Sequence, residues 1–343
     1  MTKEIGKRGR PWTAIFVLAA ACLEAGLPPE AHAGADNGAA TAVFLRMEQG
    51  ARPIGMGGAF TAVADDANSL WWNPAGMVRT EYREVQLNHT QFIENITTQF
   101  ASCIVPLSPE HGALGASFTY FNVPGIEGYT AAKQPTGDLT ANALAGSLGY
   151  AFYLTSHLSA GANIKMIKQK LADVTGSEMA ADFGIQYKNS GFAFGVALQN
   201  VGPSLDIDGV ENPLPRNLRA GIALYSPKIT VSVEGEKAYD ADFKPHFGVE
   251  WKTAPNFALR AGYQEMKNIG SAAGVSVGVS VQSLLGGGAG GWAEEGTPWW
   301  ERNMEEAEQD IKSNKLVLMT MDYAFVSYGD FSDTHRISLG FKF

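Results

Sequence analysis

Apolar and polar residues alternate along most of the chain, from about residue 83 to its end. A period of two residues predicts β-strands with one apolar and one polar face. Residues 243–252 and 256–264 show this pattern, and the last residues of the chain show it most clearly. There one face carries Ile337, Leu339, Phe341 and Phe343, and the other carries Arg336, Ser338, Gly340 and Lys342.

Turn residues divide this region into about fourteen strands. Segments of about ten residues with one apolar face are typical of a transmembrane barrel. We therefore predict an all-β fold, a membrane-spanning antiparallel β-barrel. A soluble β-sandwich would show the same period with its polar face outward, so the period alone leaves both folds open. The predicted strands lie near 83–91, 96–106, 112–123, 141–154, 157–171, 177–188, 191–202, 216–226, 228–239, 243–254, 256–267, 271–283, 315–327 and 334–343.

The predicted connections alternate in length, which gives the barrel an orientation. Longer, proline-containing loops at 124–140 and 203–215 fall on one side. Short turns face the periplasm in outer-membrane barrels, whereas longer loops face outward. The tight connections each follow an even-numbered strand: Thr155-Ser156, Asn189-Ser190, Ser226-Pro227 and Ala254-Pro255-Asn256.

One connection on the turn side, residues 284–314, is too long for a turn. It begins with a glycine-rich run at 286–291, and Thr297 and Pro298 then provide an N-cap and a first helical residue. The residues that follow predict a short amphipathic helix. The helix is either a lid packed on the barrel end or a docking site for a periplasmic partner.

The first 33 residues have the pattern of a secretory signal peptide. A basic start precedes the apolar run 12–23, and Ala31-His32-Ala33 supplies a cleavage site before Gly34. The apolar run is short for a membrane anchor. Lipidation at Cys22 is the alternative processing. Cleavage after Ala33 would leave Cys103 as the one remaining thiol, so export would bring no internal disulfide.

Composition and charge narrow the class of protein. Hydrophobic residues make up 45% and charged residues 18%, which excludes disorder as a description of the whole chain. Loss of the signal peptide removes four basic and three acidic residues and leaves 22 basic and 32 acidic residues. The resulting net charge of −10 disfavours nucleic-acid binding. The mature chain holds no apolar run long enough for a transmembrane helix. It can then span a membrane only as a closed barrel, because lipid leaves no partner for an unpaired backbone group.

A different pattern precedes the first strand. Residues 50–77 are rich in small residues, and Gly55, Gly57 and Gly58 allow sharp turns and close packing. Asn73, Pro74 and Ala75, followed by glycine, predict a fixed turn. We therefore expect residues 34–80 to form a plug segment inside the barrel, with residues 81–343 as the barrel itself.

These motifs resemble the PorV/PorQ family of outer-membrane proteins, relatives of the FadL-type fatty-acid transporters. The resemblance implies a fourteen-stranded barrel whose N-terminal segment plugs the lumen. Phe343 resembles the terminal aromatic residue by which the assembly machinery recognises barrel proteins. The insertion at 284–314 departs from the family pattern. The resemblance rests on the segment 50–77, on Gln199-Asn200-Val201-Gly202-Pro203 with Pro213-Leu214-Pro215, and on Thr334-His335-Arg336-Ile337-Ser338-Leu339-Gly340.

Charged residues on the polar faces must point into the lumen, because charge avoids lipid. They would form either ion pairs between neighbouring strands or a path for a polar ligand. The predicted lumen-facing residues are Lys165, Asp182, Glu234, Glu250, Arg260, Asp322 and Arg336.

No motif points to catalysis, and we expect no metal or other cofactor. The histidines of the mature chain have no metal-ligand spacing. Some outer-membrane acyl hydrolases are barrels with a Ser–His pair, and His89 would be the candidate here.

We expect an outer-membrane protein of PorV/PorQ type that acts in transport or protein secretion. A FadL-like uptake channel for hydrophobic small molecules is one alternative, and a structural or surface-attachment barrel without transport is another. The expected partners are outer-membrane lipid, the barrel-assembly machinery, and either secretion-system components with exported cargo or hydrophobic small molecules. Nucleic acid is not among them.

Overall fold

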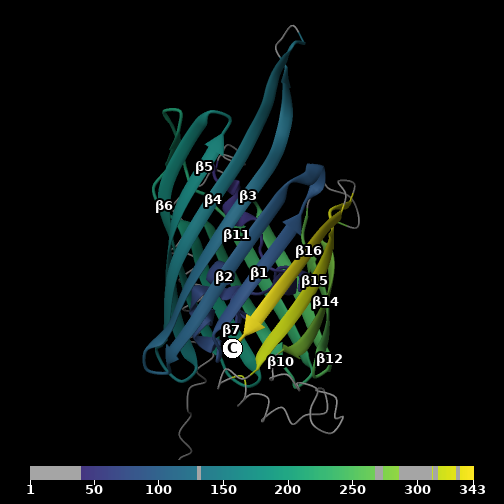
Figure 1. Cartoon of the computed structure of the whole chain (residues 1–343). Coiled ribbons are helices and arrows are strands. Elements are labelled where there is room, and N and C mark those ends of the chain that lie inside the picture. Colours follow the sequence, from purple (N-terminus) through teal and green to yellow (C-terminus); the bar gives the residue numbers. More distant parts are fainter. Residues whose placement is uncertain (1–39, 130–132, 267–272, 286–310, 312–315, 330–332) are drawn as a thin grey trace, which may run out of the picture. The chain divides into compact units, whose positions relative to one another are not determined.

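The alternating region forms a closed barrel of fourteen antiparallel strands in the computed structural model (Figure 1). The structure describes residues 40–129, 133–266, 273–285, 311, 316–329 and 333–343. Each strand pairs with the next barrel strand along the chain, and β1 closes the ring against β16. The strands are β1 (Glu84–Gln91), β2 (Thr97–Ser108), β3 (Gly112–Tyr129), β4 (Pro135–Tyr153), β5 (Leu158–Leu171), β6 (Val174–Lys188), β7 (Phe192–Val201), β10 (Asn217–Tyr225), β11 (Ile229–Ala238), β12 (Phe243–Ala254), β13 (Phe257–Gln264), β14 (Val275–Leu285), β15 (Val317–Ser327) and β16 (Asp333–Lys342).

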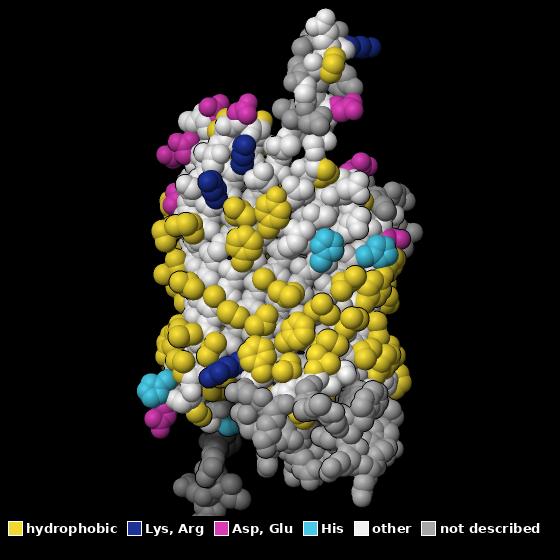
Figure 2. Space-filling model, viewed as in Figure 1, with side chains coloured by type: hydrophobic (Ala, Val, Ile, Leu, Met, Phe, Trp, Pro, Cys, Tyr) yellow, Lys and Arg dark blue, Asp and Glu magenta, His cyan; other side chains and the backbone are white. Residues whose placement is uncertain are grey.

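The two faces of the strands are the reverse of those in a soluble protein. Leu87, Phe247 and Trp251 are 45%, 46% and 48% exposed on the outer surface, whereas Glu84 and Glu234 are each 2% exposed within the barrel. Figure 2 shows apolar side chains spread as a broad band over the visible face. An apolar exterior around a polar interior is the arrangement of a transmembrane barrel, and it decides against the soluble sandwich.

The predicted strands agree with the observed ones within a few residues, except at the longest hairpin. The prediction of a loop at 124–140 was wrong, because β3 continues to Tyr129 and β4 begins at Pro135. Pairing resumes beyond an irregularity between Val123 and Ile126. Pro124 lies within that irregularity, where a residue without a backbone N–H is tolerated. The resulting β3–β4 hairpin extends beyond the other strands (Figure 1).

The second predicted loop, 203–215, contains a small hairpin. Its strands are β8 (Leu205–Ile207) and β9 (Val210–Asn212), which form a two-stranded sheet apart from the barrel. Gly209 connects them with a φ of 76°, a conformation that glycine adopts without strain.

Residues 40–80, here called the inner segment, pack against the inward face of the strands. The segment contains short helices and is among the most buried parts of the chain: Met56, Phe60 and Trp72 are each 0% exposed. They belong to a hydrophobic cluster that includes Ala193 of β7 and Ala324 of β15. The helices are η1 (Val43–Arg46), α2 (Ala51–Gly55), α3 (Ser69–Trp72) and η2 (Pro74–Arg79).

Paired glycines on the barrel wall let the inner segment approach the strand backbones. A Cβ atom at Gly262 would lie 2.0 Å from the Gly57 nitrogen, and one at Gly184 would lie 2.1 Å from the Asn73 Oδ1. Glycine within a strand often marks such an approach of another backbone. The pairs that face one another across neighbouring strands are Gly115 with Gly149, Gly161 with Gly184, Gly195 with Gly221, and Gly248 with Gly262.

No helix among the described residues is both long and apolar enough to cross a membrane. The predicted signal peptide, residues 1–33, lies outside the described residues, as does nearly all of the helix predicted within 284–314.

A side chain at Gly262 should force the inner segment away from the wall. We expect Gly262→Val to lower stability by about 1–3 kcal/mol, the usual effect of overpacking, because its Cβ has no space beside Gly57. The measurement is the thermal midpoint of heat-modifiable gel migration. Gly146→Val on β4 is the matched control, since a Cβ there meets nothing within 4 Å. Equal midpoints for the two variants would contradict the close contact.

Candidate functional site

The partly exposed guanidinium of Arg52 ties the inner segment to the barrel wall at the end with the tight turns. The Arg52 Nη1 lies 2.7 Å from an oxygen of Asp65 and 2.7 Å from one of Asp66, and its Nε donates to Glu250 of β12 at 3.1 Å. Lys188 of β6 lies 2.9 Å from the other carboxylate oxygen of Asp65. Burial alone would raise the pKa of Asp65, but Lys188 and Arg52 outweigh it and hold that pKa below its usual range. The network therefore joins the segment to two strands through paired charges.

A second network surrounds Arg219 of β10. Its Nε donates to Glu234 of β11 at 2.6 Å, and its Nη2 donates to Glu48 of the inner segment at 3.0 Å. Glu234 also accepts hydrogen bonds from the backbone N–H and the hydroxyl of Thr61, at 2.7 and 3.0 Å. The guanidinium lies over the Trp72 ring, 4.5 Å from its centroid. Because both partners on the strands are fully buried, this network anchors the middle of the inner segment.

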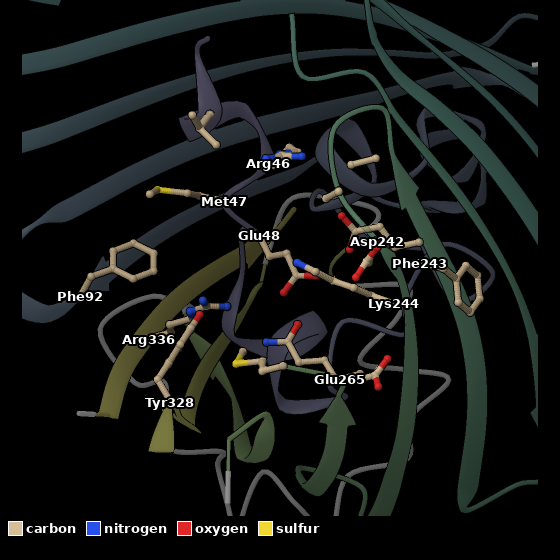
Figure 3. Close-up of a pocket in the computed structure, with 16 residues that line it drawn as sticks. Arg46, Met47, Glu48, Phe92, Asp242, Phe243, Lys244, Glu265, Tyr328 and Arg336 are labelled. Carbon is tan, nitrogen blue, oxygen red and sulfur yellow. The ribbon is translucent and has the colours of Figure 1, made fainter. Parts of the chain in front are cut away.

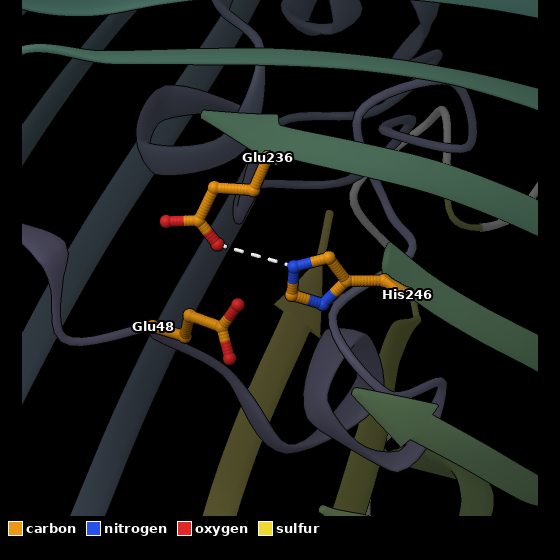
Figure 4. A group of neighbouring side chains, drawn as sticks. All are labelled: Glu48, Glu236 and His246. Carbon is orange, nitrogen blue, oxygen red and sulfur yellow. Dashed lines mark hydrogen bonds and ion pairs between the residues drawn. The ribbon is translucent and has the colours of Figure 1, made fainter. Parts of the chain in front are cut away.

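Glu48, Glu236 and His246 form the one group among the described residues with metal-like spacing, their ligand atoms lying within 4.8 Å of one another (Figure 4). The positive charge at this place is already supplied by Arg219, which is 3.0 Å from Glu48 and 3.4 Å from Glu236. Both ring nitrogens of His246 face oxygen acceptors, the carboxylate of Glu236 at 3.1 Å and the carbonyl of Gly57 at 2.8 Å. A neutral imidazole that donates from Nδ1 to Gly57 keeps Nε2 as an acceptor, so the ring alone does not exclude a metal. The guanidinium of Arg219 already neutralises both carboxylates, and the group is therefore better explained as part of the Arg219 network.

The predicted plug residues lie where the inner segment touches the wall. Gly57 and Gly58 have φ angles of 63° and 75°, which glycine adopts easily. Asn73 donates from its amide to the Thr61 carbonyl at 2.9 Å and accepts from the Ala75 N–H at 3.1 Å. The remaining members of the predicted set are Gly55, whose Cβ would lie 3.2 Å from the Gly278 Cα, and Pro74, the first residue of η2.

The predicted lumen-facing charges are all buried, and most of them pair. Lys165 lies 2.7 Å from Asp182 on the neighbouring strand. Arg260 bridges Glu250 at 2.7 Å and Asp322 at 2.8 Å. Glu234 pairs with Arg219, as described above. Arg336 forms no ion pair with another described residue, although it is 2% exposed.

Sequence reasoning did not single out Arg52, Arg219 or Glu48. Arg219 alternates with apolar residues in β10, so the period of two could have placed it on the inward face. Arg52 and Glu48 precede the strands, in a segment where apolar and polar residues do not alternate regularly. No sequence signal indicated their partners.

Phe343 continues the seam that closes the barrel. Its backbone N–H donates to the Arg83 carbonyl at 3.0 Å, and the Arg83 N–H donates to the Phe343 carbonyl at 3.1 Å. These bonds extend the β1–β16 pairing by one residue. An assembly signal at this residue stays a prediction.

Two cavities lie at opposite ends of β12. The loop-end cavity, of about 550 Å³, is bordered by Phe243 and Lys244 at the start of the strand (Figure 3). The turn-end cavity, of about 420 Å³, is bordered by Ala254 at its end. The inner segment contributes to both, with Glu48 in the first and Arg52 in the second.

Residues 32–238, more than half of the chain, match the model of the family described as type IX secretion system protein PorV. The chain belongs to the PorV family. The resemblance in the sequence motifs is thereby confirmed, and a barrel of this type fits the outer membrane. No curated protein matches the chain.

Solved structures support the fold of this PorV-family barrel. The Ralstonia pickettii toluene transporter TbuX is 13% identical, with a TM-score of 0.56 over 85% of this chain and 96% of that one. The Pseudomonas putida toluene transporter TodX is 12% identical, with a TM-score of 0.53 over 86% and 98%. A Pseudomonas aeruginosa FadL homologue is 9% identical, with a TM-score of 0.50 over 83% and 95%. At these identities the likeness shows the fold alone.

Removal of the Arg52 guanidinium should loosen the inner segment. We expect Arg52→Met to destabilise the folded barrel by about 1–3 kcal/mol, because the buried carboxylate of Asp66 would lose its partner, whereas Asp65 keeps Lys188 and Glu250 keeps Arg260. Urea unfolding in detergent measures the loss. Lys228→Met, at an exposed turn residue, is the control and should change little. A loss no larger than that of the control would contradict the anchoring role.

Proposed function

We propose that this chain is an outer-membrane component of a type IX secretion system, exported by the signal peptide at 1–33. The match of residues 32–238 to the PorV family carries the proposal. The apolar outer band and the buried polar interior support its placement in the outer membrane. Outer-membrane lipid and the barrel-assembly machinery are then its partners, and Phe343 is the residue that the machinery would recognise.

We further propose that the inner segment plugs the barrel, so that the protein acts as a docking component and not as an open pore. Full burial of Met56, Phe60 and Trp72 supports this role, as do the wall glycines that admit the segment's backbone. The Arg52 and Arg219 networks would have to break before the segment could leave. Each contains buried charges, and separating such charges from their partners is strongly unfavourable.

The surface for exported cargo or other secretion components would lie at the loop end of the barrel. The long β3–β4 hairpin and the β8–β9 hairpin both belong to this end, which the short turns at the opposite end assign to the cell exterior (Figure 1). Paired strands present a firmer binding rim than a flexible loop, because less conformational entropy is lost when a partner binds.

Uptake of a hydrophobic small molecule is the second candidate function. The loop-end cavity favours it, since Met47, Phe92, Phe243 and Met266 give the cavity an apolar lining. TbuX and TodX are named as toluene transporters. Neither candidate is an enzyme, and neither requires a cofactor.

Loss of the protein should stop secretion of cargo that carries a type IX C-terminal sorting domain. We expect a deletion strain to retain such cargo in the periplasm, and the wild-type gene to restore its appearance at the cell surface. A variant in which residues 125–137 are replaced by Asn-Gly should assemble but not restore secretion. Gly146→Val is the control that should restore it, because its Cβ meets open space. Normal secretion in the deletion strain would contradict the secretion role.

Deletion of residues 41–70 should open the barrel. We expect the variant to show higher conductance than the intact protein in planar bilayers, since the section filled by Met56 and Phe60 becomes vacant. Heat-modifiable migration establishes that the variant is folded. A folded deletion variant that conducts no more than the intact protein would contradict the plug.

A further inference from the structure

Two lysines point outward from β5 near its loop end. Burial alternates along the strand, so that Lys165 and Ile167 are buried on the inner face, whereas Lys168 and Lys170 are exposed on the outer face. Of these lysines only Lys165 has an ion pair within the described part of the chain, with Asp182. Figure 2 shows basic side chains beyond the apolar band, on the loop-end side of the visible face.

The height of Lys168 on the barrel wall corresponds to the edge of the apolar band. Leu158, the first residue of β5, follows a tight turn, and Lys168 is ten residues further along the strand. Ten residues at about 3.3 Å each, in a strand tilted by about 40°, rise by about 25 Å. The apolar band of an outer-membrane barrel is about 25 Å tall. Lys168 and Lys170 therefore lie at the level of the lipid head groups, in the leaflet on the loop side.

The neighbouring strands place uncharged polar residues beside the two lysines. Lys170 is opposite Asn142 on β4 and Thr175 on β6. Lys168 is opposite Ser177 on β6. Amide and hydroxyl groups can donate hydrogen bonds to an anion held by the ammonium groups, or bond to a sugar that carries the anion.

No acidic residue shares the outward faces of β4, β5 and β6 within 142–152, 158–170 and 175–187. Glu178 is opposite the fully buried Ile167 and therefore belongs to the inner face. Asp173 lies in the turn beyond the ends of β5 and β6. The outward surface of these strands thus carries positive charge at one level only, that of Lys168 and Lys170.

The most exposed apolar side chains lie directly below the lysines, on the periplasmic side. Leu148, Met166 and Ile164 are 72%, 66% and 59% exposed, more than any other large apolar residue that the structure describes. Leu148 and Ile164 are opposite one another on β4 and β5, and Met166 is the next outward residue of β5. Side chains that project so far from the wall can pack between the acyl chains of a lipid.

The spacing of the lysines suits a phosphate. Side chains at positions i and i+2 of a strand lie on the same face, about 6.6 Å apart at their bases. Two flexible ammonium groups can therefore converge on the oxygens of one phosphate. Exposed lysines hold a free anion weakly. An anion whose acyl chains already keep it at this level of the membrane is bound more tightly, because its effective concentration is high.

We propose that the outer face of β4–β6 binds a phosphorylated glycolipid of the lipid A type, the kind of lipid that forms the outer leaflet of an outer membrane. Lys168 and Lys170 donate to one of its phosphates, and Asn142 bonds to the sugar that carries the phosphate. The acyl chains pack on the projecting apolar side chains below. The site goes beyond the secretion role, and it rests only on the proposed orientation of the loop end towards the cell exterior.

Lipid binding to the purified mature protein in detergent tests the site with two probes. One is lipid A, and the other is the same lipid A after hydrofluoric acid has removed its phosphates. We expect the wild type to bind intact lipid A about 10-fold more tightly than the stripped lipid, because the charge-assisted bonds to the lysines are lost with the phosphates. In the double variant Lys168→Gln/Lys170→Gln this preference should disappear. Microscale thermophoresis measures the affinities, and heat-modifiable migration establishes that each variant is folded.

A second pair of neighbouring lysines, at the turn end, provides the matched control. Lys228 and Lys252 are exposed, and the Lys252 N–H donates to the Lys228 carbonyl at 2.8 Å. The double variant Lys228→Gln/Lys252→Gln removes the same charge, and it should keep the wild-type preference for intact lipid A.

Three results would overturn the proposal. The first is equal affinity of the wild type for the two probes. The second is an equal loss of preference in both double variants, which would show a non-specific attraction to positive charge. The third is displacement of lipid A by excess inorganic phosphate, which would show a site for a free anion and not for a lipid. None of these results depends on the secretion assay, so the two proposals can fail separately.

Discussion

Backbone pairing in lipid is the constraint on which the rest of this structure depends. Because the bilayer interior offers no hydrogen-bond partner, a strand can span it only if both of its edges are paired. Closure of β1 on β16 meets that requirement and leaves no free edge among the fourteen strands. It also divides every strand into a lipid face and an enclosed face, so charged residues such as Glu234 and Arg260 have only the interior available.

An enclosed polar interior must then be filled and its charges compensated. The inner segment does both, with Phe60 and Trp72 as its apolar filling and Arg52 as a counter-charge for Glu250. Glycine pairs on the strands make the contact close enough for these interactions. The same features that stabilise the barrel therefore retain the segment within it, and this is the physical link between the fold and the proposed plug.

Most buried charges on the described strands have a partner of opposite charge, and Arg336 is an exception. Arg219 and Arg260 each have a carboxylate directly across the sheet, whereas Arg336 has Thr90 and Ala324.

The sequence by itself determined the strands and which residues share a face, because a two-residue period is a local property of each strand. Which face points outward was decided by the structure, where the apolar side chains lie on the outer surface. The sequence did not determine the length of the β3–β4 hairpin, since pairing continues past the irregularity at Pro124 through contacts with the other strand. The sequence also did not determine which charged residues pair with one another. Arg219 meets Glu48 across 171 residues, and Arg336 meets no carboxylate within the described part of the chain. Only the tertiary structure decides such pairs, because they depend on strand register and on the path of the inner segment through the barrel.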